Sequence, residues 1–209
     1  PAGPAAAGVF RAAGARMKKF SDAHREFAGA ARRIEARAEH YAALGREIPA
    51  RESYILAALL WAAARWPLYE IDARYRDYEN HVVDCYDAFI ARAPRPIERI
   101  DIPFENSALS GLLHLPRTPA PGEKFPCVIN IGGMDGCKEN VVSMYGDPWL
   151  ERGIAVLADP VRDDTLEVLS KRGHGLMNQL HGERAAGAYA SPDNTVTSQL
   201  YPLAVQYGY

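Results

Sequence analysis

The chain has 209 residues, of which 48% are hydrophobic and 24% charged, and its formal net charge is -2. This balance is typical of a folded globular protein and argues against binding nucleic acid by neutralising phosphates. Three cysteines without a CxxC pair argue against a disulfide framework or a zinc site and favour a reducing, cytoplasmic location.

Two further features concern membranes and the start of the sequence. The longest nearly apolar run, 54–64, has eleven residues, which is short of the ~20 that span a bilayer, so no membrane partner is expected. Residues 1–8 lack the charged and apolar regions of a secretory signal, and we expect them to be flexible.

The first half has the 3.6-residue period of helices. Apolar residues recur at three- and four-residue steps over 20–41, with Ser21 or Asp22 as N-cap and Gly45 and Pro49 as the stop. A second, buried helix is predicted from near Ala50 to Trp66, and a third over 71–89. We expect residues 1–95 to form an all-helical domain.

Aromatic residues and histidines of this half are predicted to be structural. The aromatics sit at helical spacing and favour core packing, although a pocket for a planar substrate is compatible with them. These aromatics are Trp61, Trp66, Tyr75, Tyr78 and Tyr86. No histidine among His24, His40 and His81 has a partner at metal-ligand spacing, and we expect no metal or organic cofactor.

From Pro96 onward the period changes to that of strands. Two strands joined by a turn at 105–107 are followed by a Pro- and Gly-rich loop, a short buried strand, a helix and another buried strand. The predicted strands and helix cover 100–104, 109–115, 127–131, 138–152 and 154–158. This order predicts an α/β fold with a mixed sheet.

The loop that follows the strand at 127–131 is rich in glycine. Backbone N–H groups of Gly132 and Gly133 can approach a developing oxyanion without a side chain in the way, although a plain tight turn fits equally well. Neither a phosphate-binding GxxxxGK[ST] nor a GxGxxG motif occurs in the sequence.

Three segments resemble one family when taken in this order. The helical half followed by RPIERIDIPFENSALSGLLHLP, PCVINIGGMDGCKEN and WLERGIAVLA is similar to the alpha/beta-hydrolases with an N-terminal helical cap. That group includes pseudooxynicotine hydrolases, polyketide-shortening pigment hydrolases and the fermentation–respiration switch esterases. The resemblance implies that Gly133 and Met134 form the oxyanion hole and that the helices cap the active site.

The sequence also departs from this family. It contains no GxSxG nucleophile elbow, and the strand ending at Ala158 leads directly into a loop that resembles the one presenting the catalytic acid. We therefore expect the hydrolase sheet, residues 96–209, to be incomplete, with a segment missing near 158–164. The alternative is a non-catalytic protein that retains the capped pocket.

The resemblance and the local pattern together select candidate catalytic residues. His174 lies between glycines after a predicted strand and is the first choice for the base, with His181 as the second. Asp159 is the first choice for the acid, and Asp163 or Asp164 the second. Cys137, before a predicted helix, is an alternative nucleophile.

The function expected from these features is a serine-type hydrolase whose nucleophile lies outside the sequence shown. It would attack the carbonyl carbon of a small molecule and cleave an ester or a carbon–carbon bond of a 1,3-dicarbonyl or polyketide-like compound. We also expect a homodimer formed through the N-terminal helices.

Overall fold

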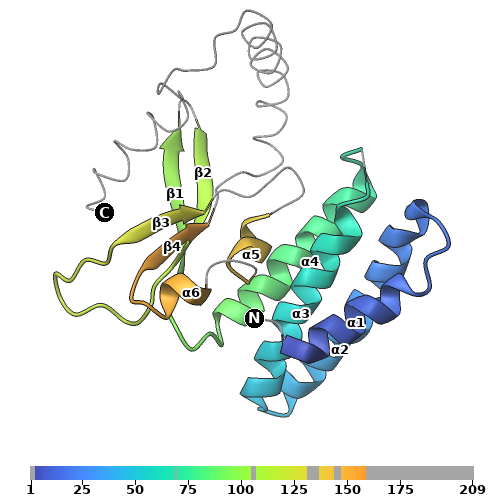
Figure 1. Ribbon diagram of the computed structural model, residues 1–209, viewed down its shortest axis with the longest axis horizontal. Helices are drawn as coiled ribbons and strands as arrows, with labels where there is room; N and C mark the ends of the chain where they lie inside the picture. The colour runs from blue at the N-terminus through green and yellow to red at the C-terminus, as the bar shows by residue number, and fades with distance from the viewer. Residues whose placement is uncertain (1–2, 69, 105–106, 131–136, 144–146, 159–209) are drawn as a thin grey trace, which may run out of the picture.

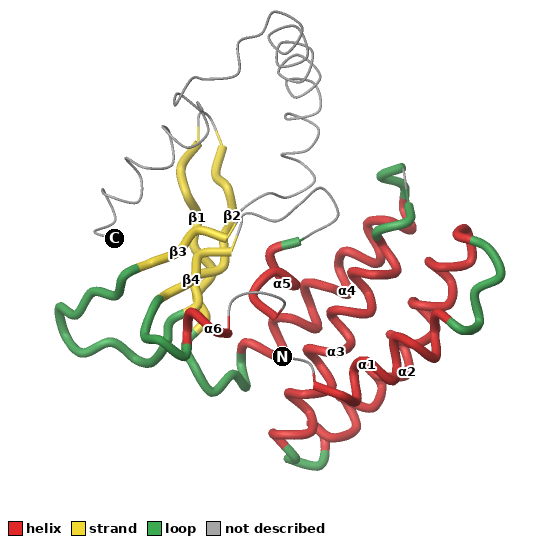
Figure 2. The backbone as a smooth tube through the Cα atoms, in the orientation of Figure 1, coloured by secondary structure: helices red, strands yellow, loops and turns green. Residues whose placement is uncertain are grey.

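A computed structural model describes residues 3–68, 70–104, 107–130, 137–143 and 147–158. Its N-terminal part is helical: α1 (Gly3–Gly14), a short η1 (Phe20–Asp22), α2 (Ala23–Ala43), α3 (Glu47–Arg65) and α4 (Ala73–Ile90). We call α1–α4 the helical unit. Figure 1 shows these helices side by side, apart from the strands, and Figure 2 shows the same division by type of structure.

The expected helices are confirmed, with three differences. Residues 3–8, expected to be flexible, belong to α1, because alanine has the highest helix propensity and Ala6 and Ala13 are buried in the core. Helix α3 begins at Glu47 and not near Ala50, because proline is tolerated in the first turn, where Pro49 stands. Trp66, which was predicted to pack in the core, is 52% exposed, because it follows the last residue of α3. Its ring packs edge-on against Phe20.

Local backbone signals explain where the helices turn. Gly45 ends α2 with a φ of 66°, a conformation that costs glycine little. Asp72 caps α4, because its carboxylate accepts a hydrogen bond from the backbone N–H of Tyr75 at 2.8 Å. Helices α2, α3 and α4 then pack in sequence against one another.

The second part is a four-stranded mixed sheet in the order β1-β2-β4-β3. Its strands are β1 (Ile97–Phe104), β2 (Ser107–His114), β3 (Cys127–Asn130) and β4 (Ala155–Ala158). Strands β1 and β2 pair as an antiparallel hairpin, β2 is antiparallel to β4, and β3 is parallel to β4. The helical N-terminal part and the mixed sheet predicted from the sequence are thus confirmed.

The helix predicted over 138–152 is described in two parts. The structure has two short helices, α5 (Lys138–Val141) and α6 (Asp147–Leu150), and residues 144–146 between them lie outside the described part. One continuous helix would place Pro148 in its interior, where proline removes a hydrogen bond and clashes with the preceding turn. In α6, Pro148 occupies the first turn instead.

The sheet packs on both faces, as the two-residue period of its strands requires. Leu112, Val156 and Ala158 belong to one hydrophobic cluster with Trp61 and Tyr86 of the helical unit. The alternate residues Leu113, Ala155 and Leu157 pack on the other face with Leu115 and Phe125. The helical unit therefore shares a continuous core with one face of the sheet.

Candidate active site

The carboxyl ends of β3 and β4 lie side by side, because the two strands are parallel and pair from Cys127↔Ala155 to Asn130↔Ala158. In the sequence, the Gly-rich loop follows β3, and Asp159 is the first residue after β4. Ligands of open α/β sheets bind at such carboxyl edges. The topology thus brings together the starting points of two segments predicted to carry catalytic groups.

The candidate residues themselves lie outside the described part of the chain. This holds for both oxyanion candidates, for both histidines and for all three acids. They are Gly133, Met134, His174, His181, Asp159, Asp163 and Asp164. Their roles remain predictions.

The segment after the Gly-rich loop is described from Cys137, which precedes α5. The side-chain Oδ1 of Asn140 accepts a hydrogen bond from the backbone N–H of Cys137 at 3.1 Å. The Cys137 side chain is buried, and burial, with a smaller contribution from Glu139, raises the pKa of its thiol to about 12. A thiol with so high a pKa is almost entirely protonated at neutral pH, which disfavours Cys137 as a nucleophile.

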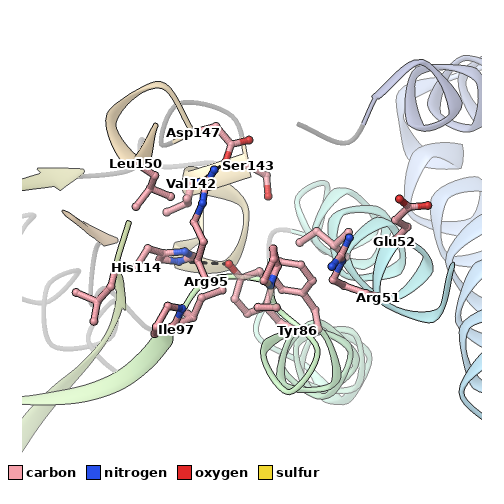
Figure 3. Close-up of a pocket in the computed structure, with 16 residues that line it drawn as sticks. Arg51, Glu52, Tyr86, Arg95, Ile97, His114, Val142, Ser143, Asp147 and Leu150 are labelled. Carbon is pink, nitrogen blue, oxygen red and sulfur yellow. Dashed lines mark hydrogen bonds and ion pairs between the residues drawn. The ribbon is translucent and has the colours of Figure 1, made fainter. Parts of the chain in front are cut away.

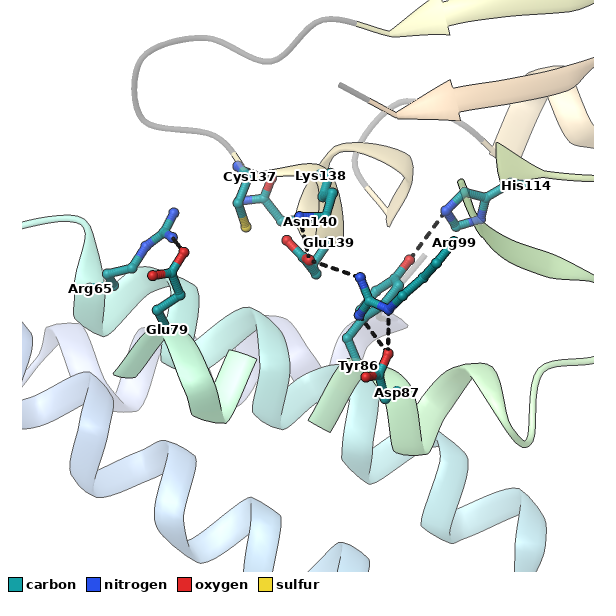
Figure 4. Close-up of polar contacts among 10 residues, drawn as sticks. All are labelled: Arg65, Glu79, Tyr86, Asp87, Arg99, His114, Cys137, Lys138, Glu139 and Asn140. Atoms are coloured by element: carbon teal, nitrogen blue, oxygen red, sulfur yellow. Dashed lines mark hydrogen bonds and ion pairs between the residues drawn. The ribbon is translucent and has the colours of Figure 1, made fainter. Parts of the chain in front are cut away.

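A cluster of charged side chains fixes α5 against the helical unit and β1. Glu139 Oε1 lies 3.4 Å from Lys138 Nζ and 3.9 Å from Arg99 Nη1, and the Lys138 and Glu139 residues are each 4% exposed. Arg99 Nε also donates to Asp87 Oδ1 of α4 at 2.8 Å (Figure 4). Glu139 thus connects α5 to β1 through Arg99, and Arg99 in turn connects β1 to α4.

His114 is a buried polar residue that the sequence reasoning missed. It is 4% exposed, and its Nε2 lies 3.4 Å from the phenol oxygen of Tyr86 in α4. Burial lowers the pKa of His114 to about 4, although the charge of Asp147 opposes this shift. The burial of His114 could have been predicted from the alternation of β2, since His114 lies on the same face of the strand as the buried Leu112.

A pocket of 320 Å³ lies between the helical unit and the sheet (Figure 3). Tyr86 and His114 line it, together with Arg51 of α3, Arg95 before β1 and Asp147 of α6. Among the described residues, no three His, Cys, Asp or Glu side chains gather as a metal-binding group. None of the described helices has the length and hydrophobicity needed to cross a membrane.

The sequence matches a family model described as "Esterase FrsA-like" over residues 37–162. This range covers the C-terminal third of α2, all of α3 and α4, and the four strands of the sheet. It also includes the Gly-rich loop and Asp159.

Individual relatives are similar over more than half of the chain. Esterase FrsA of Photobacterium profundum is 25% identical over 125 residues, which are 60% of this chain and 29% of that protein. Alpha/beta hydrolase gkaG of Penicillium citrinum is 28% identical over 154 residues, or 72% of this chain and 36% of the relative. The chain thus spans about a third of the length of these relatives.

A solved structure shares the fold. The crystal structure of 2,6-dihydroxy-pseudo-oxynicotine hydrolase matches with a TM-score of 0.58 at 24% sequence identity. The match covers 72% of this chain and 41% of that one. The helical part and the partial sheet are therefore an arrangement that also occurs within a larger hydrolase.

Proposed function

Because the chain belongs to the FrsA-like esterase family, we propose that it carries the cap and the first strands of a serine-type alpha/beta-hydrolase. In this proposal residues 1–95 form the cap and residues 96–209 belong to the hydrolase core. The family resemblance stated from the sequence is confirmed by the match over 37–162. The enzyme's reaction and substrate are the parts that we propose.

The proposed reaction begins with attack of a serine hydroxyl on a carbonyl carbon. His174 takes the proton of the hydroxyl and returns it to the leaving group, while Asp159 holds the imidazole in the required tautomer. The carbonyl oxygen becomes an oxyanion that accepts hydrogen bonds from the backbone N–H groups of Gly133 and Met134. Each such donor typically lowers the barrier by ~3 kcal/mol.

The observation that carries this proposal is the parallel pairing of β3 and β4. It aligns Asn130 with Ala158, so the oxyanion loop and the acid loop start from adjacent strands at one edge. Within this arrangement, Glu139 of α5 contacts Arg99 of β1, and Arg99 also donates a hydrogen bond to Asp87 of α4.

The nucleophile is proposed to lie outside these 209 residues, because the sequence contains no GxSxG motif. We further propose that a segment is missing near 158–164, where a loop of a later strand follows directly on β4. An intact mass of the natural protein well above 23.0 kDa is expected. A natural chain of 23.0 kDa would favour the alternative, a binding protein that retains the cap without catalysis.

An ester is the first substrate class to test, because the relative from Photobacterium profundum is named an esterase. Carbon–carbon cleavage of a 1,3-dicarbonyl or polyketide-like compound passes through the same oxyanion and is the second class. No metal or organic cofactor takes part in either proposed reaction. We also propose a cytoplasmic location and a homodimer in which the exposed Phe20 and Trp66 of the helical unit are available for contact.

The test measures hydrolysis of a 4-nitrophenyl ester and of a 1,3-diketone by the natural protein. The His174→Ala variant is expected to lose turnover while its circular dichroism and melting temperature stay unchanged, and His181→Ala serves as the matched control. A His174→Ala protein that retains more than a few per cent of the wild-type rate would overturn the assignment. Light scattering that shows a monomer at micromolar concentration would remove the proposed dimer.

A further inference from the structure

The 320 Å³ pocket lies at the amino end of β4. Its sheet wall includes His114, which pairs with Val156, and its outer wall includes Leu150 of α6, which precedes β4 in the chain. The Gly-rich loop leaves the sheet at the opposite edge, after Asn130. The pocket therefore opens where no catalytic group is predicted, and its own side chains must indicate what it holds.

Apolar side chains line the pocket on two sides. Ile55 and Phe89 line it from the helical unit, and Ile97 and Leu150 line it from the side of the sheet. Such walls favour an organic ligand over a small inorganic ion, because they stabilise a ligand by removing its apolar surface from water. The volume is at the lower end of the range for small-molecule sites, which begins at about 300 Å³.

The pocket also presents a half-buried cation. In the part of the chain that the structure describes, Arg51 has neither a hydrogen-bond nor an ion-pair partner. A second guanidinium, that of Arg95, lies 3.9 Å from Asp147. Glu52 lines the same rim but is exposed, and it follows Arg51 on α3 (Figure 3). A guanidinium without a partner favours an anionic group that can accept two parallel hydrogen bonds.

The deepest polar groups are uncharged at neutral pH. His114 and Tyr86 share a hydrogen bond, and both residues are nearly completely buried. Burial disfavours their charged forms, so the positive charge offered to a ligand comes from the arginines. Ligand affinity is accordingly expected to change little between pH 6 and pH 8.

We propose that this pocket binds a small organic carboxylate, with its carboxylate on Arg51 and its apolar body against Ile55 and Phe89. The apolar walls and the unpaired guanidinium together select this class. An inorganic anion would leave the apolar walls unfilled, and a cation would meet the guanidinium of Arg51, which has no partner among the described residues. The proposal does not depend on hydrolase activity, because it concerns binding alone.

Isothermal titration calorimetry of the 209-residue protein with benzoate tests the proposal. Saturable one-to-one binding is expected, with a dissociation constant of about 1 mM. Benzamide, which has the same ring without the charge, is expected to bind about tenfold more weakly. Phosphate, which has charge without an apolar body, is expected to show no saturation. Equal affinity for benzoate and benzamide, or tighter binding of phosphate, would overturn the proposal.

Variants separate this pocket from unspecific binding. Arg51→Gln is expected to weaken benzoate binding about tenfold without changing the melting temperature, since Arg51 has no hydrogen-bond or ion-pair partner among the described residues. Arg33→Gln on the exposed surface of α2 removes the same charge elsewhere and is expected to leave the affinity unchanged. Ile55→Ala, which shortens the apolar wall, is expected to weaken benzoate binding as well. Equal effects of Arg51→Gln and Arg33→Gln, or no benzoate binding by the wild type, would contradict the assignment.

Discussion

Tyr86 and His114 join the helical unit to the sheet through a hydrogen bond of 3.4 Å between the phenol oxygen and Nε2 of the imidazole. Tyr86 comes from α4 and His114 from β2, and both side chains are surrounded by the core that the two parts share. The helical unit is thus attached to the sheet by a specific polar contact as well as by apolar packing.

The buried His114 makes stability depend on pH. The folded protein holds the pKa of His114 at about 4, whereas the unfolded chain protonates it near the ordinary value of 6.5. Because the unfolded state binds the proton more readily, stability is complete above pH 6.5 and falls as the pH decreases toward 4. The loss is up to about 3 kcal/mol, and urea unfolding at a series of pH values measures it.

The control for this prediction compares the pH dependence of stability in two histidine variants. His114→Gln is expected to remove the decrease between pH 6.5 and 4, apart from the contribution of carboxylates at the acidic end. His40→Gln, at an exposed position of α2, is expected to keep the full decrease. A His114→Gln protein with the same pH dependence as the wild type would contradict the role given to His114.

The buried Glu139 is expected to stabilise the junction of α5, β1 and α4 through its two cationic neighbours. Glu139→Gln leaves Lys138 buried without its carboxylate partner and is expected to cost about 3 kcal/mol of unfolding free energy. The double variant Lys138→Met, Glu139→Gln is expected to cost less than the sum of the two single variants. Urea unfolding of the four proteins gives the coupling energy.

The matched control is Glu151→Gln, which removes an exposed carboxylate and is expected to change stability by less than about 0.5 kcal/mol. Strict additivity of the Lys138 and Glu139 substitutions would show that the two charges do not interact, contrary to this account.

Cys137 is expected to be unreactive in the folded protein. With a pKa of about 12 and a buried side chain, the thiol forms almost no thiolate at pH 8. Iodoacetamide at this pH should leave Cys137 unmodified in the native state and alkylate it in guanidinium chloride, as peptide mapping can show. Alkylation in the native state faster than in the unfolded chain would restore Cys137 as a candidate nucleophile.

Periodicity predicted the helices and strands well, but it did not predict the exceptions. The stripe that defines α2 and the alternation that defines β1 and β2 are local, so the sequence reveals them. The exposure of Trp66 depends on where α3 ends relative to the neighbouring elements, and the apolar pattern does not show that Pro148 stands in the first turn of α6. The first exception depends on the three-dimensional arrangement of the helices, and the second depends on one residue that outweighs the apolar pattern.

The site was less predictable than the fold. His114 lies in a strand that was predicted, yet its partner Tyr86 comes from a helix 28 residues earlier, and no local pattern links the two. Likewise, the contacts of Glu139 with Arg99 arise only when β1 and α5 meet. Long-range pairs of this kind depend on tertiary packing, and the sequence shows only the presence of each partner.

We propose that this chain is part of a serine hydrolase whose nucleophile lies outside residues 1–209. Treatment of the natural protein with a fluorophosphonate, followed by peptide mapping, tests it most directly. We expect one stoichiometric adduct, on a serine of a GxSxG sequence that is absent from residues 1–209. An inert protein, or an adduct on a serine or cysteine within residues 1–209, would contradict it.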